Sequence, residues 1–360
     1  MKNLLKVEAP EKRNFGLDLL RFIAIFTVLI SHSILLLPSK FQFIHLLITD
    51  GVLIFFVLSG FLIGRILIRD FEQGISFKKI IHFWKRRWFR TIPAYLVSIF
   101  LIITLSYLTH THFQKWEVLK TIFFIQNLNH EPKSFFIESW SLSIEEWFYL
   151  TLPILLFIFH KISKVSIKIN IIIIFFIVFI ASNFIRLFYF QNLNIGTLTE
   201  WDNNLRKPVI TRLDSILIGV LGAWIFHFKR LFFDKNKTIL FVLGFIIFLF
   251  NKFLFDFFTE FNFYSCVLYF CIMPFSILMM LPQFYYLKET KLHFVNKIIT
   301  KGSLISYSMY LVNLTIVSFL ILNHLPFNFF IKFLLFWILT ILFSILMYKW
   351  VEIPFMNMRK

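Results

Sequence analysis

The sequence predicts an all-α, polytopic membrane protein with about ten transmembrane helices, and three observations lead to this fold class. Hydrophobic residues make up 59% of the chain and charged residues only 16%, whereas soluble domains carry about a quarter charged residues. The apolar residues come in runs of roughly 20, long enough to cross a bilayer as helices. Basic residues gather in alternate connections between these runs.

The apolar runs divide the chain into ten expected spans. The first follows a basic N-terminus but extends for about 21 residues without a small-residue cleavage site, so we expect a retained span and not a signal peptide. We expect one membrane domain over residues 1–360, without a soluble domain or an internal repeat. The expected spans lie near residues 17–37, 44–64, 91–109, 140–160, 169–190, 209–228, 238–255, 263–283, 303–322 and 329–349.

The net charge of +18 predicts topology and not nucleic-acid binding. Connections on the N-terminal side of the expected membrane carry 26 Lys and Arg residues, and the opposite connections carry 6. Short loops rich in Lys and Arg stay in the cytoplasm, so both termini are expected inside. The longest connections are a basic inner stretch, 65–90, and an outer stretch, 110–139. The outer one is expected to hold a short interfacial helix within 116–127.

Arg21 and His32 are the polar residues of interest in the first span. Ionisable residues inside spans usually face the bundle interior or a wet cavity. The two are eleven residues apart, which on a helix places them on one face with a rise of about 16 Å. Histidine suits proton transfer near neutral pH. The alternative is that Arg21 marks the cytoplasmic boundary and His32 caps a neighbouring helix.

Three arginines, Arg86, Arg87 and Arg90, lie just before the expected third span, where Pro93 suits a helix start. Arg87 and Arg90 are three apart and therefore adjacent on a helix face. Paired guanidinium groups fit a phosphate better than lysines do. The group is either a dock for the phosphates of a nucleotide-bearing cofactor or a simple topology signal.

Polar residues also open the fourth span. Trp140 fits an ordinary interface aromatic, but Glu145 and Glu146 lie several residues inside the apolar run. Ser141 and Glu145 are one turn apart and can share a face. A carboxylate at this depth could orient a histidine across the bundle, and Glu145 and His32 are both expected in the outer half.

Other motifs give weaker expectations. Arg212 and Asp214 open the sixth span, as either a structural pair or an acceptor-side contact. Glu352 ends the tenth span and could lock it against a cytoplasmic arginine. The small residues of SGFLIGR, residues 59–65, suit close helix approach. No metal site is expected.

Seven of these stretches, in order over nearly the whole chain, resemble the acyltransferase 3 family of membrane acyltransferases. They are Arg21 with His32, residues 51–65, Arg87 with Arg90 and Pro93, Trp140 to Pro153, Arg212 to Asp214 with Gly219, Ser306 to Leu311, and Val351 to Phe355. The resemblance implies a ten-span fold, His32 as the essential histidine, and Arg87 and Arg90 as coenzyme A contacts. Members often carry a histidine where this chain has Asn313, and some carry a fused esterase-like domain that is not expected here.

We therefore expect transfer of an acyl group, acetyl by default, from cytosolic acyl-CoA to a hydroxyl of an envelope carbohydrate. Lipopolysaccharide O-antigen, exopolysaccharide and lipid-linked sugars are the candidate acceptors, at a bacterial inner membrane. His32 would act as base or acyl carrier, oriented by Glu145. Arg21, Arg86, Arg87 and Arg90 would hold acyl-CoA, and Trp140, Ser141, Arg212, Asp214 and Glu352 would serve the acceptor side or the structure. Delivery could use a separate periplasmic partner or occur directly in the membrane.

Two rival functions fit the same buried charges. A transporter or flippase for a lipid-linked saccharide would also need a wet cavity, but it would move its substrate unmodified and release no free coenzyme A. A non-catalytic membrane scaffold has little reason to bury Arg21, His32 and Glu145.

Overall fold

The computed structural model describes residues 13–129, 135–257 and 261–359, and within these ranges it contains helices and no strand. Nine helical segments of this part of the chain are long and apolar enough to cross a membrane. The predicted all-α, polytopic membrane fold is therefore confirmed. The orientation of the termini stays a prediction, and residues 1–12 and 130–134, whose charge contributed to it, lie outside the described ranges.

Some helices of the N-terminal half begin where a side chain caps their first amides. Asn14 accepts from the Leu17 amide at the start of α1, and Ser76 accepts from the Lys79 amide at the start of α3. Such caps supply partners for N–H groups that have none inside the helix. The elements are α1 (Phe15–Ile34), η1 (Ser39–Leu47), α2 (Gly51–Glu72), α3 (Phe77–Leu108), α4 (Lys115–Ile122), α5 (Ser139–Ser163) and α6 (Ile167–Asn192).

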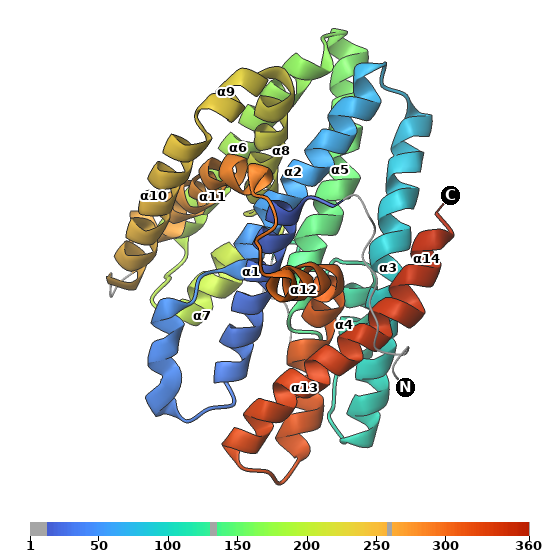
Figure 1. The fold of residues 1–360 in the computed structure, drawn as a ribbon, viewed down its shortest axis with the longest axis vertical. Helices are drawn as coiled ribbons and strands as arrows, with labels where there is room; N and C mark the ends of the chain where they lie inside the picture. Colours follow the sequence, from blue (N-terminus) through green and yellow to red (C-terminus); the bar gives the residue numbers. More distant parts are fainter. Residues whose placement is uncertain (1–12, 130–134, 258–260, 360) are drawn as a thin grey trace.

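The C-terminal half contains several short π-helical segments that interrupt or extend its helices. Figure 1 shows α9 and α10 on one side of the bundle, α3 and α14 on the other, and α1, α2 and α12 between them. The elements are α7 (Leu198–Trp201), η2 (Asp202–Arg206), α8 (Leu213–Phe228), α9 (Arg230–Lys235), α10 (Lys237–Phe257), η3 (Tyr264–Leu268), α11 (Tyr269–Tyr286), α12 (His293–Val312), η4 (Asn313–Ile321), η5 (Leu322–His324), α13 (Phe329–Met347), η6 (Tyr348–Glu352) and α14 (Ile353–Asn357).

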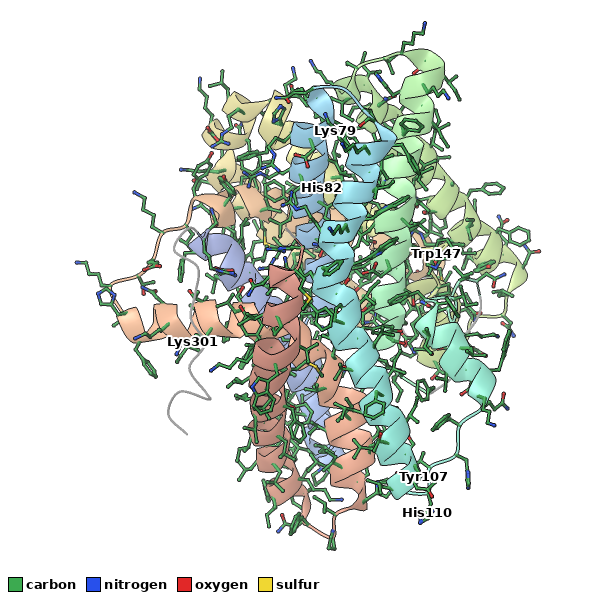
Figure 2. The ribbon with its side chains drawn as sticks, turned by 90° about the vertical axis from the view of Figure 1, so that its right-hand side faces the viewer. Lys79, His82, Tyr107, His110, Trp147 and Lys301 are labelled. Atoms are coloured by element: carbon green, nitrogen blue, oxygen red, sulfur yellow. The ribbon has the colours of Figure 1, made fainter. Side chains whose placement is uncertain are left out.

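The basic stretch 65–90 is helical and not a long loop, which corrects the expectation. α2 continues to Glu72 and α3 already begins at Phe77, because Lys and Arg are good helix formers. Figure 2 shows α3 as one continuous helix from Lys79 to Tyr107. Pro93 therefore lies inside α3 and not at its start. The arginines before Pro93 are consequently held on a rigid helix.

The expected sixth span is shorter than predicted. α8 has 16 residues, below the length of the nine segments that qualify as spans in the described ranges. It packs closely against α2: a Cβ added at Gly60 would lie 1.8 Å from the carbonyl oxygen of Ile216, and one at Gly219 would lie 2.1 Å from that of Val57. The close helix approach predicted for residues 59–65 is confirmed. The expected helix within 116–127 is present as α4, Lys115–Ile122.

Candidate functional site

A cavity of about 580 Å³ lies between α1, α2, α3, α5, α8 and α12. Its lining residues on α2 run from Val52 to Arg69, which at 1.5 Å per residue corresponds to about 26 Å. The cavity is therefore long and narrow and follows the axis of α2. Its shape suits an extended ligand.

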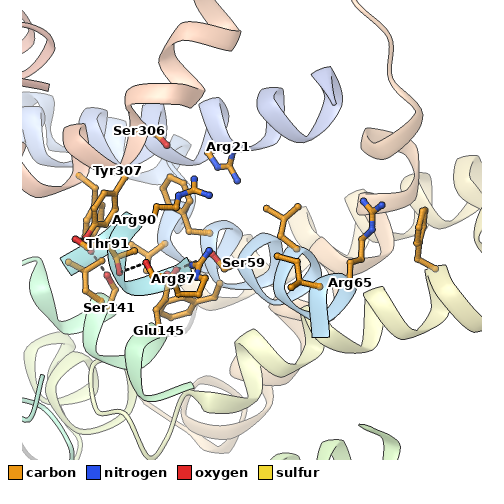
Figure 3. A pocket seen from close by; sticks show the side chains of 18 of the residues that line it. Arg21, Ser59, Arg65, Arg87, Arg90, Thr91, Ser141, Glu145, Ser306 and Tyr307 are labelled. Atoms are coloured by element: carbon orange, nitrogen blue, oxygen red, sulfur yellow. Dashed lines mark hydrogen bonds between the residues drawn. The ribbon is translucent and has the colours of Figure 1, made fainter. Parts of the chain in front are cut away.

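Three of the arginines singled out in the sequence, Arg21, Arg87 and Arg90, line the middle of this cavity. Arg21 comes from α1 and the other two from α3, and Figure 3 shows Arg21 and Arg90 close together at the cavity. Arg90 makes no hydrogen bond or ion pair with any residue in the described ranges. Its charge is therefore available to an anionic ligand.

Asp18, one turn before Arg21 on α1, is shared among several donors. It accepts hydrogen bonds from Arg13 Nε at 2.7 Å and from Ser303 Oγ at 2.6 Å. Its carboxylate stands 3.6 Å from Arg21 Nη1. Because two other donors share this carboxylate, it only partly neutralises Arg21.

Arg86 does not line the cavity, unlike its neighbours. The cavity face of α3 carries Arg87, Arg90 and Thr91, and at 100° per residue Arg86 is turned well away from the middle of that face. Arg86 is thus set apart from the cavity wall that carries Arg87 and Arg90, and its contact with the donor stays a prediction.

Glu145 lines the cavity but does not contact His32, which corrects the predicted pairing. It accepts hydrogen bonds from Ser59 Oγ at 3.1 Å and from the Tyr149 hydroxyl at 2.7 Å. Arg87 lies with its guanidinium 4.3 Å from the centre of the Tyr149 ring. Tyr149 therefore connects Glu145 to Arg87. The contact with His32 that was expected of Glu145 is made by another residue.

That residue is Asn313, at the junction of α12 and η4. His32 lies in the last turn of α1, and its Nδ1 is 2.5 Å from Asn313 Oδ1. His32 is not among the residues lining the cavity, whereas Tyr310, one turn before Asn313, is. The histidine consequently stands about one turn of α12 beyond the cavity.

A buried polar network lies at this end of the cavity. Ser141 Oγ and the Tyr310 hydroxyl are 2.6 Å apart, and the Tyr310 hydroxyl donates to the backbone carbonyl of Glu138 at 2.9 Å. The Glu138 carboxylate accepts from the Thr315 amide at 3.1 Å. Burial raises the pKa of Glu138 to about 7, although the hydrogen bonds from Thr315 oppose this shift. The predicted site residue Ser141 is thus tied to α12.

The other end of the cavity carries Arg65, Arg69 and His227, which sequence reasoning missed as site residues. The Arg65 guanidinium lies 4.6 Å from the centre of the Phe226 ring. Figure 3 shows Arg65 far from Ser141, at the opposite end. Basic residues at the end of an apolar run are typical of a topology signal, so only the folded arrangement shows that these face a cavity.

Arg212 and Asp214 do not pair with each other, contrary to one reading of the sequence. Asp214 forms a fully buried ion pair with Arg186 of α6, with Nη2 and Oδ2 2.5 Å apart. Arg212 lies over the Phe270 ring at 4.6 Å. Arg212 is the N-cap of α8 with a non-helical backbone, and Asp214 lies in the first turn of that helix. Arg212 and Asp214 therefore each contact a residue of a different neighbouring helix.

Trp140 and Glu352 also have structural partners. Arg206 lies 4.7 Å over the Trp140 ring and forms an ion pair of 3.1 Å with Asp50. Burial raises the pKa of Asp50, but the charge and hydrogen bonds of Arg206 outweigh it, so the pKa falls below its usual value. Glu352 accepts a hydrogen bond from Ser308 of α12. Its predicted arginine contact is not among the ion pairs of the described residues.

Comparison with known proteins places this cavity in context. A family model described as "Acyltransferase domain", acyltransferase 3, matches residues 14–349. "Putative O-acetyltransferase SACOL0978" of Staphylococcus aureus strain COL is 27% identical over 94% of this chain and 57% of its own length. "O-acetyltransferase OatA" of S. aureus strain NCTC 8325 is 31% identical over 66% of this chain and 39% of its own.

The chain therefore matches 57% of the length of the first relative and 39% of the length of the second. No solved structure matched it. The family model covers all of the helices that form the cavity. The chain belongs to the acyltransferase 3 family.

Proposed function

We propose that this protein transfers an acyl group, in the first instance acetyl, from acyl-CoA to a hydroxyl of an envelope carbohydrate. The observation that carries the proposal is an arginine-lined cavity, in a chain of an acyltransferase family, that ends about one helical turn from His32. The names of the relatives, which are O-acetyltransferases, support an ester product.

The cavity suggests how acyl-CoA would lie. Acyl-CoA is an extended molecule with a nucleotide at one end, a thioester at the other and a pyrophosphate between them. The phosphates would contact the guanidinium groups of Arg21, Arg87 and Arg90, since charge-assisted hydrogen bonds to phosphate are strong. The nucleotide would extend towards Arg65 and Arg69, and the thioester towards Ser141 and Tyr310.

His32 would then act at the thioester end. Acting as base, its Nε2 would take the proton of the acceptor hydroxyl while the hydroxyl oxygen attacks the thioester carbonyl carbon. The carbon–sulfur bond breaks, and the coenzyme A thiolate leaves with the proton returned from Nε2. Acting as acyl carrier, Nε2 would attack the carbonyl carbon, and the carbon–sulfur bond would break with the coenzyme A thiolate as leaving group. In a second step the acceptor hydroxyl oxygen would attack the acyl carbon, the nitrogen–carbon bond would break, and the hydroxyl proton would pass to the thiolate.

The acceptor would enter from the side of the bundle opposite to acyl-CoA. A polysaccharide, an O-antigen or a lipid-linked sugar of a bacterial envelope fits this arrangement, with the protein in the plasma membrane. A separate periplasmic partner is an alternative route of delivery.

The direct test supplies membranes with acetyl-CoA labelled in the acetyl group and measures alkali-labile label in envelope fractions. Wild-type protein should form labelled ester and release free coenzyme A, and His32→Ala should form none at equal membrane abundance. Equal ester formation by His32→Ala would reject the assignment. Movement of a saccharide without release of coenzyme A would instead support a flippase.

A further inference from the structure

The strongest unassigned feature is the contact between His32 and Asn313, which are 281 residues apart in sequence. The tautomer of a neutral histidine follows from the hydrogen bonds that its two ring nitrogens make. Here the network around Asn313 settles which atom faces the ring.

The Asn313 amide is held in one orientation by α12. Its Nδ2 donates to the backbone carbonyl of Met309 at 2.9 Å and to that of Tyr310 at 2.8 Å. The regular α-helical pattern ends at Val312 and a π-helical segment follows. The Met309 carbonyl also accepts from the Asn313 backbone amide, so the side chain is folded back onto its own helical turn. Because Nδ2 is used for two carbonyls, only Oδ1 can face His32.

An amide oxygen accepts hydrogen bonds and cannot donate them. His32 Nδ1, 2.5 Å from this oxygen, must therefore carry a hydrogen, and in the neutral ring the lone pair then lies on Nε2. Asn313 itself is fully buried, which strengthens the constraint because an unpaired amide oxygen there would be unfavourable.

We propose that Asn313 is the positioning residue of this site: it accepts the Nδ1 hydrogen of His32, fixes the ring orientation, and makes Nε2 the nitrogen that meets the substrate. This inference rests on the proposed function for its catalytic consequence, but the tautomer itself does not. Asn313 takes the place of Glu145 as the group that orients the imidazole, because the Glu145 carboxylate accepts hydrogen bonds from Ser59 and Tyr149.

Substitutions at Asn313 separate positioning from packing. Asn313→Asp keeps an acceptor oxygen for His32 but places a carboxylate against two carbonyls, whereas Asn313→Leu has similar size and no acceptor. If the side chain only satisfied the helix carbonyls, Asp would be at least as damaging as Leu. If it positions His32, Asp should keep kcat within about 10-fold, and Leu should lower kcat roughly 100-fold or more, the scale of general-base catalysis.

The KM for acyl-CoA should change less than about 3-fold in both variants, because Asn313 does not line the donor cavity. Asn127 provides a matched control. It is also fully buried, and its Nδ2 also donates to two carbonyls, those of Trp140 at 2.9 Å and Lys207 at 2.7 Å. At Asn127, Asp should give no advantage over Leu in kcat.

The tautomer is measured directly in wild-type protein, so the inference stays testable if variants fail to fold. With ¹⁵N-labelled histidine, the signals missing from the His32→Ala spectrum belong to His32, and their shifts should show a protonated Nδ1. An unprotonated Nδ1, or equal loss of kcat in Asn313→Asp and Asn313→Leu, would overturn the proposal. A protonated Nδ1 in a protein that forms no ester would leave the positioning contact standing and reject the proposed function alone.

Discussion

Arg90 offers the sharpest test of donor binding, because its guanidinium lines the cavity without a hydrogen bond or ion pair to any described residue. Arg90→Gln keeps a side chain that can donate hydrogen bonds but removes the charge. Arg86→Gln is the matched control: it removes a charge four residues earlier on α3 from a side chain that does not line the cavity.

The expected loss of coenzyme A affinity follows from the loss of one charged hydrogen bond to the ligand. A hydrogen bond to a charged group contributes about 1.5–3 kcal/mol, and 1.4 kcal/mol corresponds to a tenfold change in affinity. Arg21 and Arg87 remain on the same cavity wall, so binding is weakened and not abolished. Arg90→Gln should therefore raise the Kd for coenzyme A roughly 10- to 100-fold, and Arg86→Gln should change it less than about 2-fold.

The assay is titration calorimetry of coenzyme A with purified protein in lipid nanodiscs. Dephospho-coenzyme A and pantetheine, titrated in parallel, report which phosphates Arg90 contacts, because removing the contacted phosphate should erase the difference between wild type and Arg90→Gln. Equal weakening by Arg86→Gln and Arg90→Gln would refute the reasoning, since overall basic charge and not cavity geometry would then hold the donor.

Three further predictions concern the scaffold. Arg186→Leu leaves the Asp214 charge buried without its partner, so thermal unfolding in detergent should show a loss of about 3–5 kcal/mol, most of which Arg186→Leu with Asp214→Leu should restore. Gly219→Val should separate α2 from α8 and lower both the Tm and coenzyme A affinity; an unchanged Tm would contradict the close packing. The Asp50–Arg206 pair stabilises the fold above the usual carboxyl pKa of about 4 and loses its effect as pH falls through the lowered pKa of Asp50. The Tm difference between wild type and Asp50→Asn should accordingly shrink below about pH 4, and a difference that grows there would contradict this sign.

Local sequence spacing predicted those parts of the site that lie on one helix. Arg87 and Arg90 were expected on a common face, and both line the cavity. Ser141 and Glu145, one turn apart on α5, also share it. These relations depend only on the 3.6-residue period of the helix, and they hold whatever the neighbours are.

Pairings between helices were predicted less well. Glu145 was expected to orient His32, but it contacts Ser59 and Tyr149, while Asn313 contacts the histidine. Both carboxylate and amide were visible in the sequence as polar residues within apolar runs. Which of them meets His32 depends on how α1, α5 and α12 are rotated about their axes, and spacing along one helix does not report that rotation.

The sequence by itself determined the all-α membrane class and the family. Inside lipid every backbone polar group needs an internal partner, so runs of about 20 apolar residues are committed to helices before any tertiary contact forms. The tertiary structure decided which buried polar groups meet, including Asn313 with His32 and Arg186 with Asp214. Those choices follow from interhelical packing, which close contacts such as Gly60 against Ile216 fix in register and rotation.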